Sequence, residues 1–424
     1  MTITTGDFFM SQTNPGLQVN PKILAFGRTS FNMTIEDVAR KIGQKPEVIQ
    51  EWEAGTLFPT YAQLEKLATA YKIPLAIFLF PEIPEEYKIR SSFRTLPDSV
   101  YDKLDAHMIL LFRNQKSILE NMKELDQLLK GSENPGLFFE NFSWISSEVQ
   151  KNNLDHIRFR SLFGVSLDEQ KSWKDSKEAL ETWIFAFESL GILVTRDAFL
   201  NDDISGFCLY DERYPLICLN NSHTDNRCIF TLFHEFAHLA MQTSGIVDRN
   251  DGFIEELEPS ARDVEILCNK IAGKLLVPDD DFQQTIRRIE SETNAGISDL
   301  LSDCLSELFG EIISEIAEIY HVSREVILRK FLDFGIIGPD TYEIFISKWA
   351  HFSKNKKEDK TKGGNYYSNM AVYLGDAYLK TVLSAYNDHK ITDQEASLYL
   401  GGIKIDNIPK LEEAAILRWN KWRK

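Results

Sequence analysis

The stretch that decides the fold around it, residues 226–242, reads NRCIFTLFHEFAHLAMQ. It contains neither glycine nor proline, and its apolar residues recur at helical spacing, so we expect a buried α-helix. On a helix, residues four apart share a face, with their Cβ atoms about 5–6 Å apart. His234 and His238 have this spacing, which lets two imidazoles converge on one ion. Glu235 is rotated away from direct ligation but stays close, which is the position of a base.

A second expected helix, residues 260–276, offers the third ligand that such a histidine pair needs. Its buried stripe consists of Val264, Leu267, Ile271 and Leu275. Glu265 therefore lies at the edge of the inward face, and Asn269, one turn further on, can orient an imidazole. Two histidines and a glutamate with an open fourth position suit zinc hydrolysis better than electron transfer. The alternative is a buried helix whose histidines are satisfied core residues, but it leaves the matching Glu265 and Asn269 unexplained.

Between residues 191 and 220 the pattern changes from helical to extended. An expected helix over Ser176–Leu190 precedes three short apolar runs, which are Gly191–Thr195, Ile204–Tyr210 and Leu216–Asn220. We interpret the runs as three strands, the last two forming a hairpin. Because proline lacks the N–H that a central strand donates, Pro215 places the third strand at the sheet edge. A peptide substrate is then expected to pair along the backbone of Leu216, Ile217, Cys218, Leu219 and Asn220.

The length of 424 residues predicts two to four folding units. We predict a helix-turn-helix domain over residues 21–82, a helical connector over 83–155, the domain with the histidine pair over 156–350 and a small helical unit over 366–424. Within the connector, a long helix between Tyr101 and Leu129 would space the domains. Ser353–Gly364 is poor in apolar residues and is expected to be a mobile linker. The fold class is therefore α+β and mostly helical, with a small three-stranded sheet and an all-α N-terminal domain.

Composition indicates the class of protein and the cellular compartment that suits it. It is 43% apolar and 26% charged, as in soluble globular proteins. Five widely spaced cysteines without a C-x-x-C pair predict neither a disulfide framework nor a thiolate zinc knuckle, and a reducing cytoplasm fits best. The N-terminus and the apolar runs argue against secretion and membrane insertion. The net charge of −17 repels polyphosphate, so binding of nucleic acid would need a local basic patch.

Two longer segments resemble the ImmA/IrrE family of zinc metallopeptidases. Residues 217–239 read ICLNNSHTDNRCIFTLFHEFAHL, and residues 256–278 read ELEPSARDVEILCNKIAGKLLVP. The positions that match the family's pattern are Asn220, His234, Glu235, His238, Glu265, Asn269, Ala272, Leu275, Leu276 and Pro278. Val277 stands where methionine is usual, which is an apolar change. The resemblance spans residues 156–350 and implies zincin-like active-site helices, bound Zn²⁺, Glu265 as third ligand and cleavage of a transcriptional repressor or antitoxin.

The chemistry expected of this site is general-base hydrolysis of a peptide bond. Zinc would activate a water molecule and polarise the peptide carbonyl, while Glu235 would take the proton of the water and return it to the leaving amine. The alternative is a DNA- or protein-binding transcriptional regulator or antitoxin-like partner whose zinc site is structural or idle. Glu235 discriminates between the two, because a structural zinc site has no need of a base. The sequence leaves the oligomeric state open.

Residues 23–80 resemble the XRE-type helix-turn-helix of phage repressors. Matching structural positions are Thr34, Ala39, Gly43, Ile49, Trp52, Glu53, Gly55, Pro59, Leu64 and Ala68. The DNA-facing positions that the resemblance implies are Ile35, Gln44, Lys45, Pro46, Glu47 and Glu51. Gln44 and Lys45 are the candidates for DNA contact, but the six Lys and Arg residues between Pro21 and Tyr71 are matched by six Asp and Glu residues. Such a charge-balanced module is not an electrostatic clamp, and DNA binding and protein docking both stay open.

Overall fold

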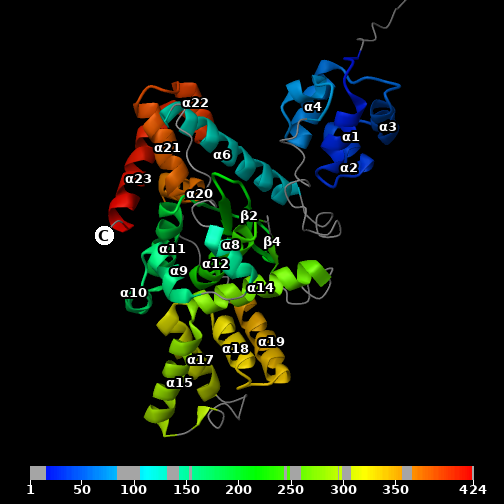
Figure 1. Cartoon of the computed structure of the whole chain (residues 1–424). Helices are drawn as coiled ribbons and strands as arrows, with labels where there is room; N and C mark the ends of the chain where they lie inside the picture. Colours follow the sequence, from blue (N-terminus) through cyan, green and yellow to red (C-terminus); the bar gives the residue numbers. More distant parts are fainter. Residues whose placement is uncertain are drawn as a thin grey trace, which may run out of the picture. The chain divides into compact units, whose positions relative to one another are not determined.

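The structure is a computed structural model that describes residues 16–83, 106–130, 143–151, 155–242, 246–248, 259–294, 296–297, 307–355 and 365–422. The chain divides into two units (Figure 1). The first comprises Met1–Ser91 and Asp98–Asn114, and the second comprises Ser92–Pro97 and Gln115–Lys424. Each unit is treated by itself below.

The first unit is built from short capped helices. They are α1 (Pro21–Thr29), α2 (Ile35–Ile42), α3 (Pro46–Ala54), α4 (Tyr61–Tyr71) and the 3₁₀ helix η1 (Leu75–Leu79). The expected capping box starts α2, because Thr34 Oγ1 accepts the N–H of Asp37 at 3.2 Å and Asp37 Oδ2 accepts the N–H of Thr34 at 3.1 Å. Gly43 ends α2 in the left-handed conformation that glycine adopts without strain. The predicted all-α N-terminal domain is confirmed.

The second unit contains a four-stranded mixed sheet. Its strands are β1 (Leu193–Asp197), β2 (Ile204–Leu209), β3 (Leu216–Asn220) and β4 (Ile246–Asp248). Their order is β1-β3-β2-β4, with β1 and β3 parallel and the other pairs antiparallel. The three predicted strands and the β2–β3 hairpin are present, and the short β4 joins them.

The expectation that Leu216–Asn220 forms an edge strand is wrong. The strand β3 lies inside the sheet, between β1 and β2, and all five of its residues are buried. Pro215 precedes the strand, so its missing N–H falls outside the ladder, while its carbonyl still accepts the N–H of Leu193 at 2.8 Å. A proline at the start of a strand is therefore compatible with an interior position.

Helices α12 (Asp225–Ala240) and α11 (Ser176–Ser189) pack against the sheet, and α14 (Pro259–Leu276) packs against α12; together they form the main core. An aromatic cluster joins α11, α12 and α9 (His156–Phe163); its members are Phe159, Phe163, Phe187, Phe233 and Phe236. Gly206 in β2 allows α12 to approach closely, since a Cβ there would lie 2.5 Å from Cγ2 of Thr231. These contacts fix α12 against the sheet.

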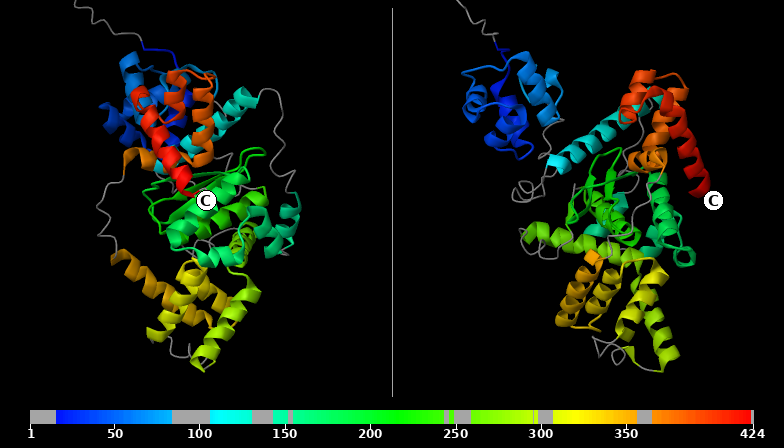
Figure 2. Two further views of the ribbon diagram at one scale, coloured as in Figure 1. Left: turned by 90° about the vertical axis from the view of Figure 1, so that its left-hand side faces the viewer. Right: turned by 180° about the vertical axis from the view of Figure 1, so that it is seen from behind.

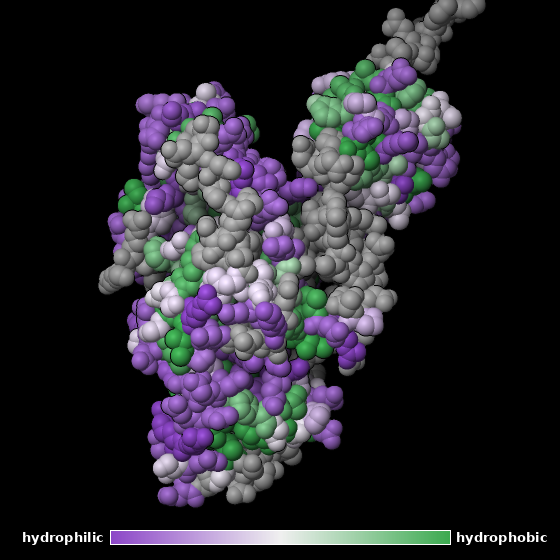
Figure 3. Space-filling model, viewed as in Figure 1, coloured by the Kyte–Doolittle hydropathy of each residue, from purple (hydrophilic) through white to green (hydrophobic). Residues whose placement is uncertain are grey.

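Further helices surround this core. They are α8 (Ser143–Gln150), α10 (Leu167–Ser172), α15 (Asp279–Thr293), α17 (Glu307–Tyr320), α18 (Arg324–Asp333) and α19 (Pro339–Asn355). Buried polar side chains hold the end of α14, because Arg160 donates to the carbonyl of Leu275 at 2.8 Å and Gln170 to that of Leu276 at 3.1 Å. Figure 3 shows a largely hydrophilic face, with an apolar patch over α17 to α19.

The C-terminal helices pack against the core of the second unit. They are α20 (Tyr366–Leu374), α21 (Asp376–Asn387), α22 (Asp393–Tyr399), the 3₁₀ helix η5 (Ile405–Asn407) and α23 (Ile408–Trp422). Gly375 approaches the outer strand β1 so closely that a Cβ would lie 2.4 Å from the carbonyl oxygen of Val194. Arg418 pairs with Glu181 at 2.5 Å and with Asp376 at 2.8 Å. These helices therefore cover the β1 edge of the sheet.

The predicted long helix is α6 (Ala106–Lys130). From Gln115 onward it lies beside the C-terminal helices in both views of Figure 2. Thr195 of β1 donates to Gln115 at 2.6 Å, and Asn121 donates to Tyr378 of α21 at 3.0 Å. This part of α6 is thus a packed element and more than a spacer.

Some expectations concern residues outside the described ranges. Helix α19 reaches Asn355, and the rest of the expected linker, residues 356–364, lies outside them. Cys304 also lies outside, whereas the other four cysteines are buried and form no disulfides within the described ranges. Among the helices described, none combines the length and apolar content of a membrane span.

Candidate active site

The histidine pair lies on α12, which is buried on nearly all sides. Thr224 caps the helix by accepting the N–H of Arg227 at 3.4 Å. His234, Glu235 and His238 are 1%, 0% and 2% exposed. Burying three polar side chains in an apolar core is costly unless they meet suitable partners. Their burial therefore indicates that they have partners in a functional site.

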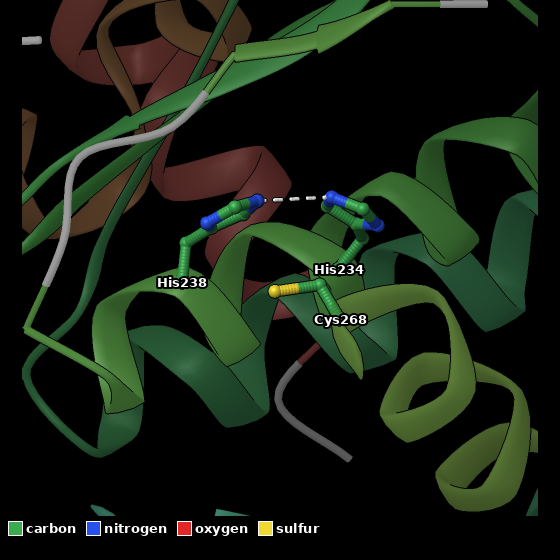
Figure 4. Close-up of side chains that lie close together, drawn as sticks. All are labelled: His234, His238 and Cys268. Atoms are coloured by element: carbon green, nitrogen blue, oxygen red, sulfur yellow. Dashed lines mark hydrogen bonds between the residues drawn. The ribbon is translucent and has the colours of Figure 1, made fainter. Parts of the chain in front are cut away.

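Three side chains converge at one point beside α12. The Nε2 atoms of His234 and His238 are 3.1 Å apart, and Figure 4 shows the two imidazoles facing each other. Glu265 of α14 completes the group, with Oε2 3.1 Å from Nε2 of His234 and Oε1 3.1 Å from Nε2 of His238. Tetrahedral ligands at about 2.0–2.1 Å from zinc lie about 3.3–3.4 Å apart. The spacing of these atoms fits a zinc ion within a few tenths of an ångström.

Asn269 orients one of the imidazoles. Its Oδ1 accepts the Nδ1–H of His234 at 2.8 Å, which leaves Nε2 of that ring directed at the other two side chains. A partner of this kind fixes both the tautomer and the ring direction of a metal-binding histidine. The structure thus brings together His234, His238, Glu265 and Asn269, and Glu235 follows His234 on α12.

Cys268 is a rival to Glu265 as third ligand. Its sulfur lies within 4.8 Å of a ring nitrogen of each histidine and is seen below the pair of rings in Figure 4. Burial raises the pKa of the Cys268 thiol well above its ordinary value. Burial also acts to raise the pKa of Glu265, but the two imidazoles outweigh it and lower that pKa. The 3.1 Å distances from the Glu265 oxygens to both imidazoles favour Glu265.

The predicted substrate strand does not reach a free surface. Leu216, Ile217, Cys218, Leu219 and Asn220 form the interior strand β3, whose backbone pairs on both sides. They cannot pair with a peptide. The Asn220 side chain instead holds the preceding loop, donating to the carbonyls of Asn201 at 3.0 Å and Ile204 at 2.8 Å.

A cleft of about 560 Å³ opens beside His234 and Glu265. One face of α14 lines it from Glu265 to Lys274, and Phe230 of α12 and Tyr342 of α19 contribute to its walls. The sequence pattern assigned site roles on α14 only to Glu265 and Asn269. The continuation at Lys270, Gly273 and Lys274 keeps the same helical face and could have been found from that spacing.

The helix-turn-helix candidates lie at the turn between α2 and α3. Lys45 is exposed, and Gln44 is partly exposed. Glu47 and Glu51 are also exposed on α3. Arg28 pairs with Glu53 at 2.7 Å inside the domain. This cation therefore stabilises the fold and does not add to a DNA-binding surface.

Two family models match the chain. Residues 187–332 match a peptidase family model described as "IrrE N-terminal-like domain", and residues 26–78 match a model described as "Helix-turn-helix". Along the chain, the match to the helix-turn-helix model comes first and the match to the IrrE-type peptidase model follows it. The IrrE-type match contains α12, α14 and the converging side chains, and it supports a metallopeptidase.

A curated relative shares a short stretch with this chain. "Vegetative-specific protein H7" of Dictyostelium discoideum is 33% identical over 69 residues, which is 16% of this chain. The matched region spans 64% of that relative's length.

Proposed function

We propose that the second unit is a zinc-dependent endopeptidase that cleaves a specific regulatory protein, such as a transcriptional repressor or an antitoxin. The observation that carries the proposal is the set of 3.1 Å separations among His234, His238 and Glu265. A matching peptidase family model over the same residues supports it. In this proposal the three side chains hold Zn²⁺ and Asn269 orients His234.

In the proposed hydrolysis, zinc and Glu235 have different roles. Zinc at this position supplies Lewis-acid chemistry toward water and the peptide carbonyl. Glu235 accepts a proton from the attacking water as its oxygen bonds to the carbonyl carbon. Glu235 then gives that proton to the amine nitrogen as the C–N bond breaks. Its complete burial keeps bulk water away from this proton.

The sheet suggests where a substrate lies. Extended peptides bind sheet edges through backbone hydrogen bonds. The β1 edge is covered by Gly375 and the C-terminal helices, whereas β4 pairs with β2 on one side and is the outer strand at the other end. Within the part of the chain that the structure describes, Ile246–Asp248 is thus the edge that remains. We assign the backbone contacts of the substrate to β4 in place of β3.

The helix-turn-helix domain supports a regulatory target. A recognition module on the same chain raises the local concentration of whatever it binds, a DNA site or a repressor with a similar fold. Its balanced charge favours docking of a protein over tight, salt-dependent binding of DNA. The proposal therefore places the target in gene regulation.

The test compares cells that produce the wild-type chain with cells that produce a His234→Ala, His238→Ala variant. New protein N-termini are quantified by mass spectrometry, with and without stress or phage induction. The proposal expects one regulatory protein to be cut only when the histidines are present. If no terminus depends on the histidines under any condition, the peptidase proposal is wrong and a binding-protein function replaces it.

A further inference from the structure

The cleft beside the metal site runs along α14, because one face of this helix lines it. The α14 residues on this face are Glu265, Ile266, Asn269, Lys270, Gly273 and Lys274. Their spacing keeps them on a single helical face. The cleft therefore starts at the converging ligands and runs toward the C-terminal end of α14.

Most charges in this cleft are already paired. Lys330 pairs with Asp279 at 2.5 Å, and Arg329 pairs with Asp333 at 3.6 Å. A third pair, at 3.8 Å, joins Arg227 of α12 to Glu325 of α18. All six of these side chains line the cleft.

Two further lysines in the cleft have no carboxylate partner among the described residues. Lys270 and Lys274 also line the cleft, and among the described residues no carboxylate lies within 4.0 Å of either ammonium group. Apart from Glu265, the cleft thus has two more cations than carboxylates, in a chain whose net charge is −17. The unpaired positive charge is complementary to an acidic ligand.

Gly273 leaves room between the two lysines. A Cβ at this position would meet no heavy atom within 4 Å, so a side chain there would project into open space. Glycine inside a helix costs about 0.5–1 kcal/mol relative to alanine. The open space it leaves lies where a peptide running along α14 would pass.

Distances along the helix set a register for such a peptide. A helix rises about 1.5 Å per residue, so Lys270 and Lys274 lie about 7.5 Å and 13.5 Å from Glu265 along the axis. An extended peptide rises about 3.3 Å per residue, which places its second and fourth residues near these lysines. Residues two apart in an extended chain share a face, so both side chains point to α14 together.

We propose that this cleft is a specificity subsite for acidic peptides, in which Lys270 and Lys274 bind Asp or Glu side chains two and four residues from the cleaved bond, on one side of it. The inference rests on the proposed peptidase function. It adds a substrate class to that function, which is a protein with alternating acidic residues beside the scissile bond.

Binding is measured first, because it does not require catalysis. The probe is a fluorescent eight-residue peptide with Asp at two positions separated by one residue, and the reference is the same peptide with Asn. Full-length, zinc-loaded Glu235→Gln protein is expected to bind the Asp peptide more tightly than the Asn peptide. Reversal of both lysines (Lys270→Glu, Lys274→Glu) should weaken binding of the Asp peptide by about 10-fold to 100-fold.

The matched control is the double reversal Lys177→Glu, Lys380→Glu, which changes two exposed lysines outside the cleft by the same charge. It should bind the Asp peptide like the parent protein. Gly273→Leu is a second variant, in which a good helix former fills the open space, so the fold should hold while both peptides bind more weakly. Equal binding of the Asp and Asn peptides, or equal loss in the control, contradicts the proposal.

Cleavage is measured second, on a peptide library digested by the wild-type chain and read by mass spectrometry. Asp and Glu should be enriched at the second and fourth positions on one side of the cut, and the lysine reversal should abolish this enrichment. Cleavage without enrichment contradicts the subsite and leaves the peptidase function standing. Selective binding of the Asp peptide with no cleavage supports the subsite and contradicts the peptidase function.

Discussion

Replacing Glu265 or Cys268 by alanine tests which side chain is the third metal ligand. Each carboxylate oxygen of Glu265 lies 3.1 Å from one imidazole Nε2, the separation that a shared zinc ion requires. Glu265→Ala leaves only two protein ligands. Loss of a residue that merely orients a ligand costs about 10-fold to 100-fold in metal affinity, so loss of the ligand itself should cost about 100-fold or more. Cys268→Ala should bind zinc like the wild type.

The assay equilibrates each purified full-length variant with a series of zinc chelators of known affinity and measures bound zinc by mass spectrometry. Wild type and Cys268→Ala should hold about one zinc per chain. Asn269→Ala gives an internal scale, since it removes only the 2.8 Å contact to His234 and should weaken binding about 10-fold to 100-fold. Zinc that persists in Glu265→Ala and is lost in Cys268→Ala would show that the thiol is the ligand and refute the reasoning.

Three further predictions concern the rest of the chain. Arg418→Met leaves the buried carboxylate of Glu181 with one partner fewer and should lower the free energy of unfolding by about 3 kcal/mol in urea titrations, whereas an unchanged midpoint contradicts this. Burial, helped by Asp376, raises the pKa of Glu188 to about 8. The folded state then retains a proton that the unfolded state loses near pH 4.5, so stability should fall with rising pH between about 4.5 and 8 by at most about 1.4 kcal/mol per unit. Glu188→Gln should remove this part of the pH dependence of the free energy of unfolding. Identical pH dependence in the wild type and the variant would argue against the prediction. The helix-turn-helix should bind duplex DNA weakly with a shallow salt slope, and nanomolar binding at physiological salt that is lost in Lys45→Glu contradicts that prediction.

Local patterns predicted the parts of the fold that depend on neighbours in sequence. The spacing of His234 and His238 places them on one helical face, and the capping box at Thr34 forms within four residues. Glu265 and Asn269 were found for the same reason, since their separation of four residues keeps them on one turn of α14. All these features follow from helical periodicity.

Strand order could not be predicted in this way. Whether β3 lies inside the sheet or at its edge depends on how the chain crosses from β1 to β2, and Pro215 carries no information about that crossing. Strand β4 has three residues, Ile246–Asp248, which is too short for an alternating pattern to be seen. The substrate strand was therefore assigned to the wrong part of the sheet.

Contacts between distant residues were also beyond the sequence. Arg418 and Glu181 are 237 residues apart, and neither has a local pattern that identifies its partner. Gly375 reads as a loop residue, although its lack of a side chain lets the C-terminal helices approach Val194. The docking of these helices on the sheet edge depends on such long-range contacts.

The central claim is that Glu235 serves as the base of a zinc peptidase, and the rate of cleavage tests it most directly. The measurement compares single-turnover cleavage of an identified substrate by wild type and by Glu235→Gln at equal, measured zinc content. Because loss of a general base commonly costs 10²–10⁴-fold, the variant should be slower by about that factor while it folds and binds zinc like the wild type. Equal rates in the two proteins would contradict the claim.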